Sequence, residues 1–284
     1  MKTVNSLSGG KTSAYIAANY KADYNVFALV RTSDRRCLYP DSKMRQKVSD
    51  KLGVDFIGTL EDDTIIHTMF DLEQFIGSEI NWVTGLSFDD ILTHPSNNLL
   101  PSTLRRYCTA QMKLEPIFDF WLENIAIPCY MNIGFRANEM NRASNVLEKV
   151  NDKGLLVQKH IVGKHKNGNN RWKKTEWQKP QFPLIEAAIY KDNIDSFWKD
   201  KPVRFAWMNN CVGCFHKNPI LLKKMSEKHP AKIEWFADKE RDRKLSWDTF
   251  RRDGYTYDKI IAHPLQVEIF EDDFSECDSG HCGI

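Results

Sequence analysis

The 284-residue chain lacks any run of about 20 consecutive apolar residues, which a membrane-spanning helix needs, so an integral membrane protein is excluded. Its N-terminus has no apolar segment typical of a secretory signal, and we expect a cytoplasmic protein. Internal repeats with periods of about 20 to 50 residues and low-complexity segments are also lacking. These absences leave an ordinary globular chain, long enough for one large domain or a domain with an appendage.

A strong charge of either sign is lacking too. The net charge is +2, because 40 lysines and arginines face 38 aspartates and glutamates. This balance excludes a global attraction to nucleic acid but is compatible with a local basic patch. Seven cysteines, an odd number, accompany no export signal. A disulfide scaffold is therefore not expected, and clustered cysteines indicate metal binding or thiol chemistry.

Short apolar runs alternate with helical patterns along the chain. We predict strands over 2–7, 25–31, 54–60 and 129–135, and helices over 12–20, 44–52, 114–124 and from 192. Alternating strands and helices predict right-handed crossovers and an α/β fold with a doubly wound, mainly parallel sheet.

Two regions are expected from this pattern. Residues 1–200 are expected to form a nucleotide-binding α/β domain, with a mostly helical excursion at about 64–124 and a basic excursion at about 159–180. Residues 201–284 are expected to form a helical, cysteine-bearing C-terminal region and tail.

A glycine turn with the sequence SGGKTS joins the first predicted strand to the first predicted helix. Glycines let the backbone approach a phosphate, and a helix N-terminus offers free N–H groups and a positive dipole end. A Walker A loop is excluded because it requires a glycine where this chain has Asn5. The turn predicts a phosphate site, against the alternative of a tight turn that binds nothing. The candidate nucleotide-binding residues are Ser8, Gly9, Gly10, Lys11, Thr12 and Ser13.

This turn resembles the SGGxDS loop of the adenine nucleotide alpha hydrolase superfamily, the PP-loop enzymes, except that Thr12 stands where ATP-cleaving members have Asp. Four further segments resemble elements of one branch, the phosphoadenosine phosphosulfate (PAPS) reductase family, particularly its short phage and bacterial members. They are LRRYCT at 104–109 followed by Lys113, IGFRANE at 133–139 with Arg142, FPL at 182–184 with Phe197 and Trp198, and CVGCFHK at 211–217. The resemblance covers residues 8 to about 240 and implies a PP-loop, or HUP-like, sheet.

Arg136 and Arg142 follow a predicted strand end, the edge at which open parallel sheets bind ligands. With Lys11 they are the candidate catalytic residues, and Arg136 is also a candidate nucleotide contact, because guanidinium groups neutralise phosphate or sulfate. The alternative is a surface ion-pair network with Glu139, which the spacing also permits.

Cys211 and Cys214 have the spacing of a two-ligand chelate. Cys108 is the predicted third metal ligand and Cys282 the fourth, with Cys277 and His281 as competitors. Four thiolates suit an iron–sulfur cluster or structural zinc, and unconnected thiols are a further alternative. The family resemblance implies a four-iron four-sulfur cluster. Two other cysteines, expected to be ordinary buried thiols, are Cys37 and Cys129.

The basic stretch at 159–179 contains nine lysines, arginines and histidines, interleaved with Trp172 and Trp177. Basic groups for phosphate and indoles for base stacking suit a single-stranded or tRNA-like substrate. The alternative is a solvated loop whose tryptophans pack on the domain. Residues 168–170 (GNN) suit a hairpin turn.

The family resemblance implies an enzyme that cleaves the α–β phosphate bond of ATP, with Mg²⁺, for sulfur transfer, and we expect an acceptor such as tRNA or DNA. One alternative is a PAPS or adenylyl-sulfate reductase, because the tail around Cys277 resembles the E-C-G-x-x-H ending of those enzymes, whose cysteine is the nucleophile. Another is a catalytically silent nucleotide-binding regulatory module, which Thr12 favours. The sequence predicts no membrane partner and leaves a homo-oligomer open.

Overall fold

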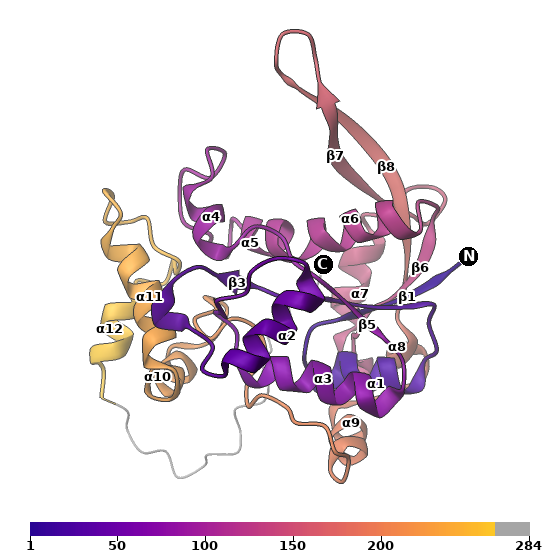
Figure 1. The fold of residues 1–284 in the computed structure, drawn as a ribbon, viewed down its shortest axis with the longest axis horizontal. Helices are drawn as coiled ribbons and strands as arrows, with labels where there is room; N and C mark the ends of the chain where they lie inside the picture. Colours follow the sequence, from indigo (N-terminus) through magenta and orange to yellow (C-terminus); the bar gives the residue numbers. More distant parts are fainter. Residues whose placement is uncertain (265–284) are drawn as a thin grey trace.

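The computed structural model describes residues 1–264, and Figure 1 shows their arrangement. Its main sheet has six strands in the order β5-β2-β1-β6-β8-β7, all parallel to their neighbours except β7. These strands are β1 (Thr3–Leu7), β2 (Tyr24–Ala28), β5 (Ile80–Val83), β6 (Cys129–Asn132), β7 (Leu156–Lys164) and β8 (Asn170–Gln181). The prediction of an α/β fold with a mainly parallel sheet is confirmed.

Helices cover both faces of this sheet. On one face α1 (Lys11–Asn19), α2 (Ser42–Leu52), α3 (Thr64–Ile76) and α9 (Lys191–Trp198) share an apolar core. On the other face the core contains α6 (Glu115–Asn124) and α7 (Met140–Leu147), and the short α8 (Pro183–Glu186) contributes to both cores. Alternate residues of β2 reach the two cores, because successive strand side chains point to opposite faces.

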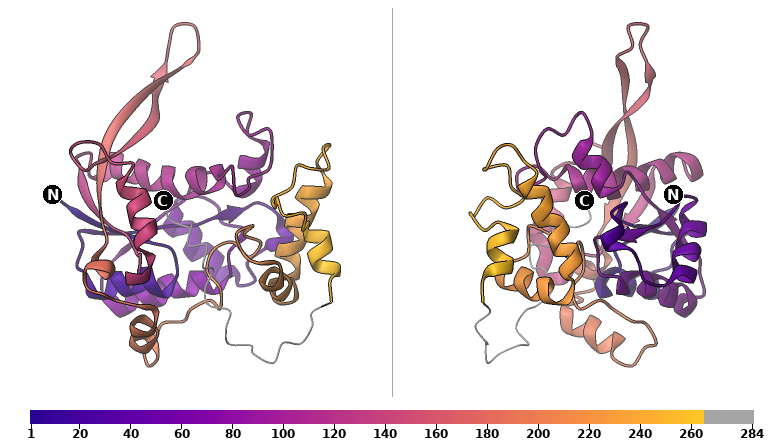
Figure 2. Two further views of the ribbon diagram at one scale, coloured as in Figure 1. Left: turned by 180° about the vertical axis from the view of Figure 1, so that it is seen from behind. Right: turned by 60° about the vertical axis from the view of Figure 1, so that its left-hand side comes forward.

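A third apolar core lies at one end of the sheet, where Figure 2 shows the C-terminal helices side by side. It is formed by α4 (Phe88–Thr93), α5 (Tyr107–Thr109), α10 (Pro219–Lys228), α11 (Pro230–Arg241) and α12 (Tyr257–Ala262). A π-helical turn, Ala110–Leu114, connects α5 directly to α6. The third core is therefore joined to the sheet by continuous chain.

Three buried amide side chains fix the register of the central strands. Asn5 of β1 lies opposite Asn25 of β2 and Asn132 of β6. Asn5 Nδ2 donates to Asn25 Oδ1 at 3.0 Å, and Asn132 Nδ2 donates to Asn5 Oδ1 at 2.8 Å. All three side chains belong to residues that are at most 5% exposed. A slip of one residue would leave these amides buried without partners, at a cost of about 1–3 kcal/mol each.

The structure differs from the sequence expectations in three places. The region at about 64–124, expected to be a helical excursion, contains the edge strand β5, whose four residues are too few for a clear two-residue pattern. The strand expected over 54–60 is reduced to β4 (Gly58–Thr59), which pairs with β3 (Arg31–Thr32) in a separate antiparallel sheet. The basic excursion at 159–180 is a β-hairpin, as its GNN turn indicates, but the last residues of β8 unexpectedly pair with β6 in the main sheet.

We expect Asn5→Val to lower the free energy of unfolding by about 2–3 kcal/mol, because Asn25 Oδ1 and Asn132 Nδ2 lose a buried partner. Replacing all three asparagines by valine removes both partners of each bond, so the triple variant should be clearly more stable than the sum of three single losses predicts. Urea denaturation measures the free energy of unfolding of each variant. If the losses of the three single variants simply added up to the loss of the triple variant, the hydrogen bonds between these amides would not be coupled as the structure indicates.

Candidate functional site

Two turns meet at the carboxyl edge of the sheet, beyond neighbouring strands β1 and β6. The chain leaves β1 toward β2 on one side, whereas β8 and β7 lie on the other side of β6, so the strand order reverses here. A side chain added at Gly134, after β6, would lie 3.5 Å from Ser13 N, after β1. Ligands of open α/β sheets bind at such a point of reversal.

The glycine turn after β1 is preformed. Gly9 has a φ of +81°, and a Cβ there would lie only 2.5 Å from the Ile65 side chain, so both conformation and space require glycine. Gly10 is the N-cap residue of α1 and has no side chain to cap the helix. Ser13 Oγ instead donates to Gly10 O and accepts from Ser8 N, both at 3.1 Å. The first turn of α1 therefore begins at the carboxyl edge of the sheet with backbone N–H groups that have no partner within the helix.

Lys11 is held at the rim of this turn by α9. Its Nζ lies 2.6 Å from Asp195 Oδ1, and the two side chains are 35% and 37% exposed. Trp198 Nε1 donates to Lys11 O at 3.0 Å. The ammonium group is thus anchored to α9, and the Lys11 side chain remains partly exposed.

The two candidate arginines belong to a partly buried ion-pair network. Arg136 donates to Glu139 Oε2 through its backbone N–H at 2.8 Å and its Nε at 3.1 Å. Arg142 donates to Glu139 Oε1 at 2.5 Å and lies over the Phe135 ring, 4.1 Å from its centroid. Burial opposes ionisation of Glu139, but these donors and the two positive charges lower its pKa. The ion-pair network predicted as the alternative is present, and both guanidinium groups bind the same carboxylate.

Three of the predicted metal ligands line one cavity. Cys108 of α5 meets Cys211 and Cys214, which come from the turn before α10, although about 100 residues of sequence separate them. Cys37 and Cys129 are 2% and 0% exposed, as expected of buried thiols, and neither lines this cavity. Cys37 belongs to the same apolar core as Cys108, whereas Cys129 belongs to the core around α6 and α7. The predicted fourth ligand Cys282 lies outside the described residues, as do its competitors Cys277 and His281.

The cysteine turn is fixed from beneath by the C-terminal helices. Lys217, only 1% exposed, donates to Asn209 O at 3.1 Å and to Cys211 O at 2.6 Å. The Tyr257 hydroxyl donates to Gly213 O, and a Cβ at Gly213 would lie 2.3 Å from the Phe236 ring. The sequence motif contains Lys217 and Gly213, but their supporting role requires knowledge of the tertiary contacts.

The protonation of the thiols and the charge of Arg106 determine what kind of group this cavity can bind. Burial raises the pKa of the Cys108 thiol to about 11, and burial together with the Glu61 carboxylate raises the pKa of Cys211. Both thiols are therefore neutral near pH 7 until a metal displaces their protons. Arg106 lines the same cavity, and its Nε and Nη2 are buried without a hydrogen-bond partner among residues 1–264.

This donor set fits an anionic, thiolate-ligated metal group with Arg106 as counter-charge. Across residues 1–264, however, no three His, Cys, Asp or Glu side chains are already arranged to hold a metal ion. The thiols share a cavity without forming a ready-made site. Metal binding would have to draw them together, and a fourth ligand would have to come from elsewhere.

The cysteine turn also touches the glycine turn. A Cβ at Gly10 would lie 2.5 Å from Asn209 Nδ2, two residues before Cys211. Lys113 of the π-helical turn lines both the cysteine cavity and a second cavity along the end of β1, and its Nζ lies 2.8 Å from the fully buried Glu61 carboxylate. The two candidate sites are therefore neighbours.

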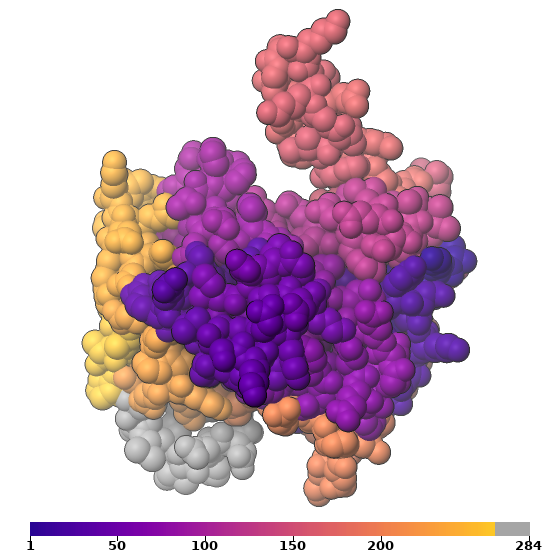
Figure 3. All heavy atoms as spheres, in the orientation of Figure 1, coloured from indigo at the N-terminus to yellow at the C-terminus, as the bar shows by residue number. Residues whose placement is uncertain are grey.

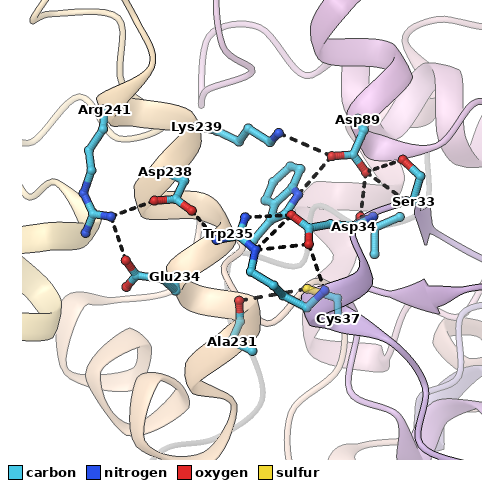
Figure 4. Close-up of polar contacts among 12 residues, drawn as sticks. Ser33, Asp34, Cys37, Asp89, Ala231, Glu234, Trp235, Asp238, Lys239 and Arg241 are labelled. Carbon is cyan, nitrogen blue, oxygen red and sulfur yellow. Dashed lines mark hydrogen bonds and ion pairs between the residues drawn. The ribbon is translucent and has the colours of Figure 1, made fainter.

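Polar contacts dock α11 on the segment that follows β3, as Figure 4 shows. Asp89 accepts hydrogen bonds from Trp235 Nε1 at 3.0 Å and from Thr32 Oγ1 at 2.6 Å. Arg36 forms ion pairs with Asp34 and with Asp238 of α11. The loop at 32–36 thus helps to hold the C-terminal helices.

Comparison with protein-family models, with curated proteins and with solved structures gives no match in any of the three. No helix within residues 1–264 has both the length and the apolar character needed to cross a membrane.

Substitutions at Lys11 and Asp195 test whether the Lys11 ammonium group contacts phosphate. If the Lys11 ammonium contacts phosphate, Lys11→Met should weaken ATP binding by about tenfold or more, the loss of one charged hydrogen bond. Asp195→Asn breaks the same ion pair but leaves the positive charge, and should keep or strengthen binding. Isothermal titration calorimetry distinguishes them. Equal effects of the two variants on ATP affinity would mean that Lys11 only pairs with Asp195 of α9 and does not contact phosphate.

Proposed function

We propose that this chain is a PP-loop enzyme that binds ATP on residues 8–13 and cleaves its α–β phosphate bond to activate an acceptor for sulfur transfer. The main observation behind this proposal is the contact between Gly10 and Asn209, which sets the cysteine cavity beside the glycine turn. A nucleotide on the turn would lie next to the thiols. The five ordered motifs that resemble the PAPS reductase family support the same assignment.

The residues of the crevice suit a phosphate leaving group. Backbone N–H groups at the start of α1 would hold the β- and γ-phosphates, and the helix dipole favours negative charge there. Lys11 beside the turn, and the guanidinium groups of Arg136 and Arg142, would stabilise the charge that develops on pyrophosphate. These contacts would act mainly by electrostatics and positioning.

The reaction would balance as two displacements. An acceptor oxygen attacks the α-phosphorus, pyrophosphate leaves, and AMP becomes attached to the acceptor. A sulfur nucleophile then displaces AMP, so that a bond to oxygen is replaced by a bond to sulfur. Cys108, Cys211 and Cys214 would hold a four-iron four-sulfur cluster, which supplies a redox-active centre beside the nucleotide.

Product analysis tests the proposed reaction. Anaerobically purified protein should release pyrophosphate from ATP and Mg²⁺ in the presence of its acceptor, supplied as total tRNA or as duplex DNA, and Lys11→Met should lose most of this activity. Release of sulfite from PAPS or adenylyl sulfate, without pyrophosphate from ATP, would replace the proposal with a sulfonucleotide reductase. Tight ATP binding with neither product would instead indicate a regulatory module.

The cysteine cavity has its own test. Cys211→Ser should abolish bound iron and the absorption near about 400 nm expected of a thiolate-bound iron cluster. Cys129→Ser is the matched control, because Cys129 is fully buried but belongs to the core around α6 and α7, away from the core that contains Cys108. Metal analysis and visible spectra of anaerobic preparations measure both. A colourless protein with stoichiometric zinc would contradict the iron–sulfur assignment.

A further inference from the structure

The β7–β8 hairpin projects from the body of the protein as a two-stranded arm, here defined as residues 157–175 (Figures 1 and 3). Every residue from 161 to 174 is exposed, including the large side chains of Ile161 and Trp172, which are 49% and 51% exposed. A two-stranded ribbon without a core is marginally stable in water, so the arm contributes little to folding. Its exposed apolar side chains indicate a contact surface.

The base of the arm is firmly attached to α6. The His160 ring packs against Phe118 with a centroid separation of 5.0 Å, and its Nε2 shares a 3.0 Å hydrogen bond with Thr175 Oγ1. Trp177, directly beyond the arm, is 4% exposed and packs on the same Phe118 ring. One of the two tryptophans of the basic stretch thus belongs to the core, and Trp172 belongs to the arm.

The arm concentrates the positive charge of the chain. It contains no Asp or Glu, and its lysines and arginine are Lys159, Lys164, Lys166, Arg171, Lys173 and Lys174. Removing these six from the 40 basic residues leaves 34 against 38 aspartates and glutamates, so the rest of the chain has a net charge of −4. The balanced charge of the whole sequence therefore conceals a strongly basic projection on an acidic body.

The positive side chains project from both faces of the ribbon. Residues paired across antiparallel strands share a face, and successive pairs alternate. Lys159 pairs with Lys174, and the ammonium of Lys159 lies 4.7 Å from the centre of the Trp172 ring on that face. His160 pairs with Lys173 on the opposite face. The remaining basic residues surround the turn at the tip.

We infer that this arm binds double-stranded DNA by inserting into the major groove. The groove of B-DNA is about 12 Å wide and admits a two-stranded ribbon, with phosphates along both walls. Charges on both faces match two walls, whereas a single strand lying on the arm would meet one face. The major groove of duplex RNA is too deep and narrow for side chains to enter. DNA as the acceptor follows only if the proposed function also holds.

Lys173 and Lys174 provide a matched test, because they are adjacent, exposed and on opposite faces. Fluorescence anisotropy without nucleotide would compare a 20-base-pair DNA duplex with single-stranded DNA and duplex RNA of the same length. Wild-type protein should bind duplex DNA most tightly. Lys173→Ala and Lys174→Ala should each weaken that binding by about threefold to tenfold. Each should also make the slope of log affinity against log salt concentration shallower, by roughly the contribution of one phosphate contact. Lys244→Ala, an exposed lysine beyond α11, should leave it unchanged.

Several results would overturn the inference. They are equal affinity for all three nucleic acids, tighter binding of single strands or of duplex RNA, and a loss confined to Lys174→Ala. Thermal melting of the variants would show that their folds are intact. Pyrophosphate release is measured separately, so DNA binding without it would refute the proposed function alone, and release without DNA binding would refute the arm's role alone.

Discussion

The hydrogen-bonded row of Asn25, Asn5 and Asn132 is the constraint on which the rest of the structure depends. Apolar strand residues would tolerate several pairings, but buried amides tolerate only one in which every donor and acceptor is matched. The fixed register makes β1 and β6 end at the same edge. Their turns then come close enough for Gly134 to lie beside Ser13. The close approach of these two turns is therefore a consequence of polar groups buried in the middle of the sheet.

A second consequence concerns the C-terminal helices. Their core is separate from the two cores that flank the sheet, and it is joined to the sheet through the network around Asp89 and Arg36 and through the cysteine turn. The backbone of that turn also pairs with the segment at Glu61, through the bridge to Cys211 and the bond from Val212 N to Leu60 O. The thiols thus lie at a junction between two packed units, a common place for ligand sites.

Much of this arrangement can be predicted from local patterns. The first strand, the glycine turn, the helices at α1, α2 and α6, and the shared location of Cys108 with Cys211 and Cys214 agree with the sequence expectations. The pattern misses β5 because its four residues are bounded by polar residues and resemble a continuation of α3. The sequence does not predict that Asn209 approaches Gly10 or that Arg106 lines the cysteine cavity, because both depend on which distant segments pack together. Nor does it predict the face on which each arm residue lies, because that depends on strand register. The basic stretch and its hairpin turn are visible in the sequence, but its projection from the protein as an arm is not, because that depends on the tertiary structure.

The π-helical turn at Ala110–Leu114 has a consequence for how this chain can vary. It joins α5, which bears Cys108, to α6, which packs on the sheet, without an intervening loop. Each residue added to or removed from a continuous helix rotates the downstream part of that helix by about 100°. A single insertion or deletion between Cys108 and α6 would therefore turn the thiol away from its cavity. Such length changes should be tolerated at the tip of the hairpin and selected against in this short segment.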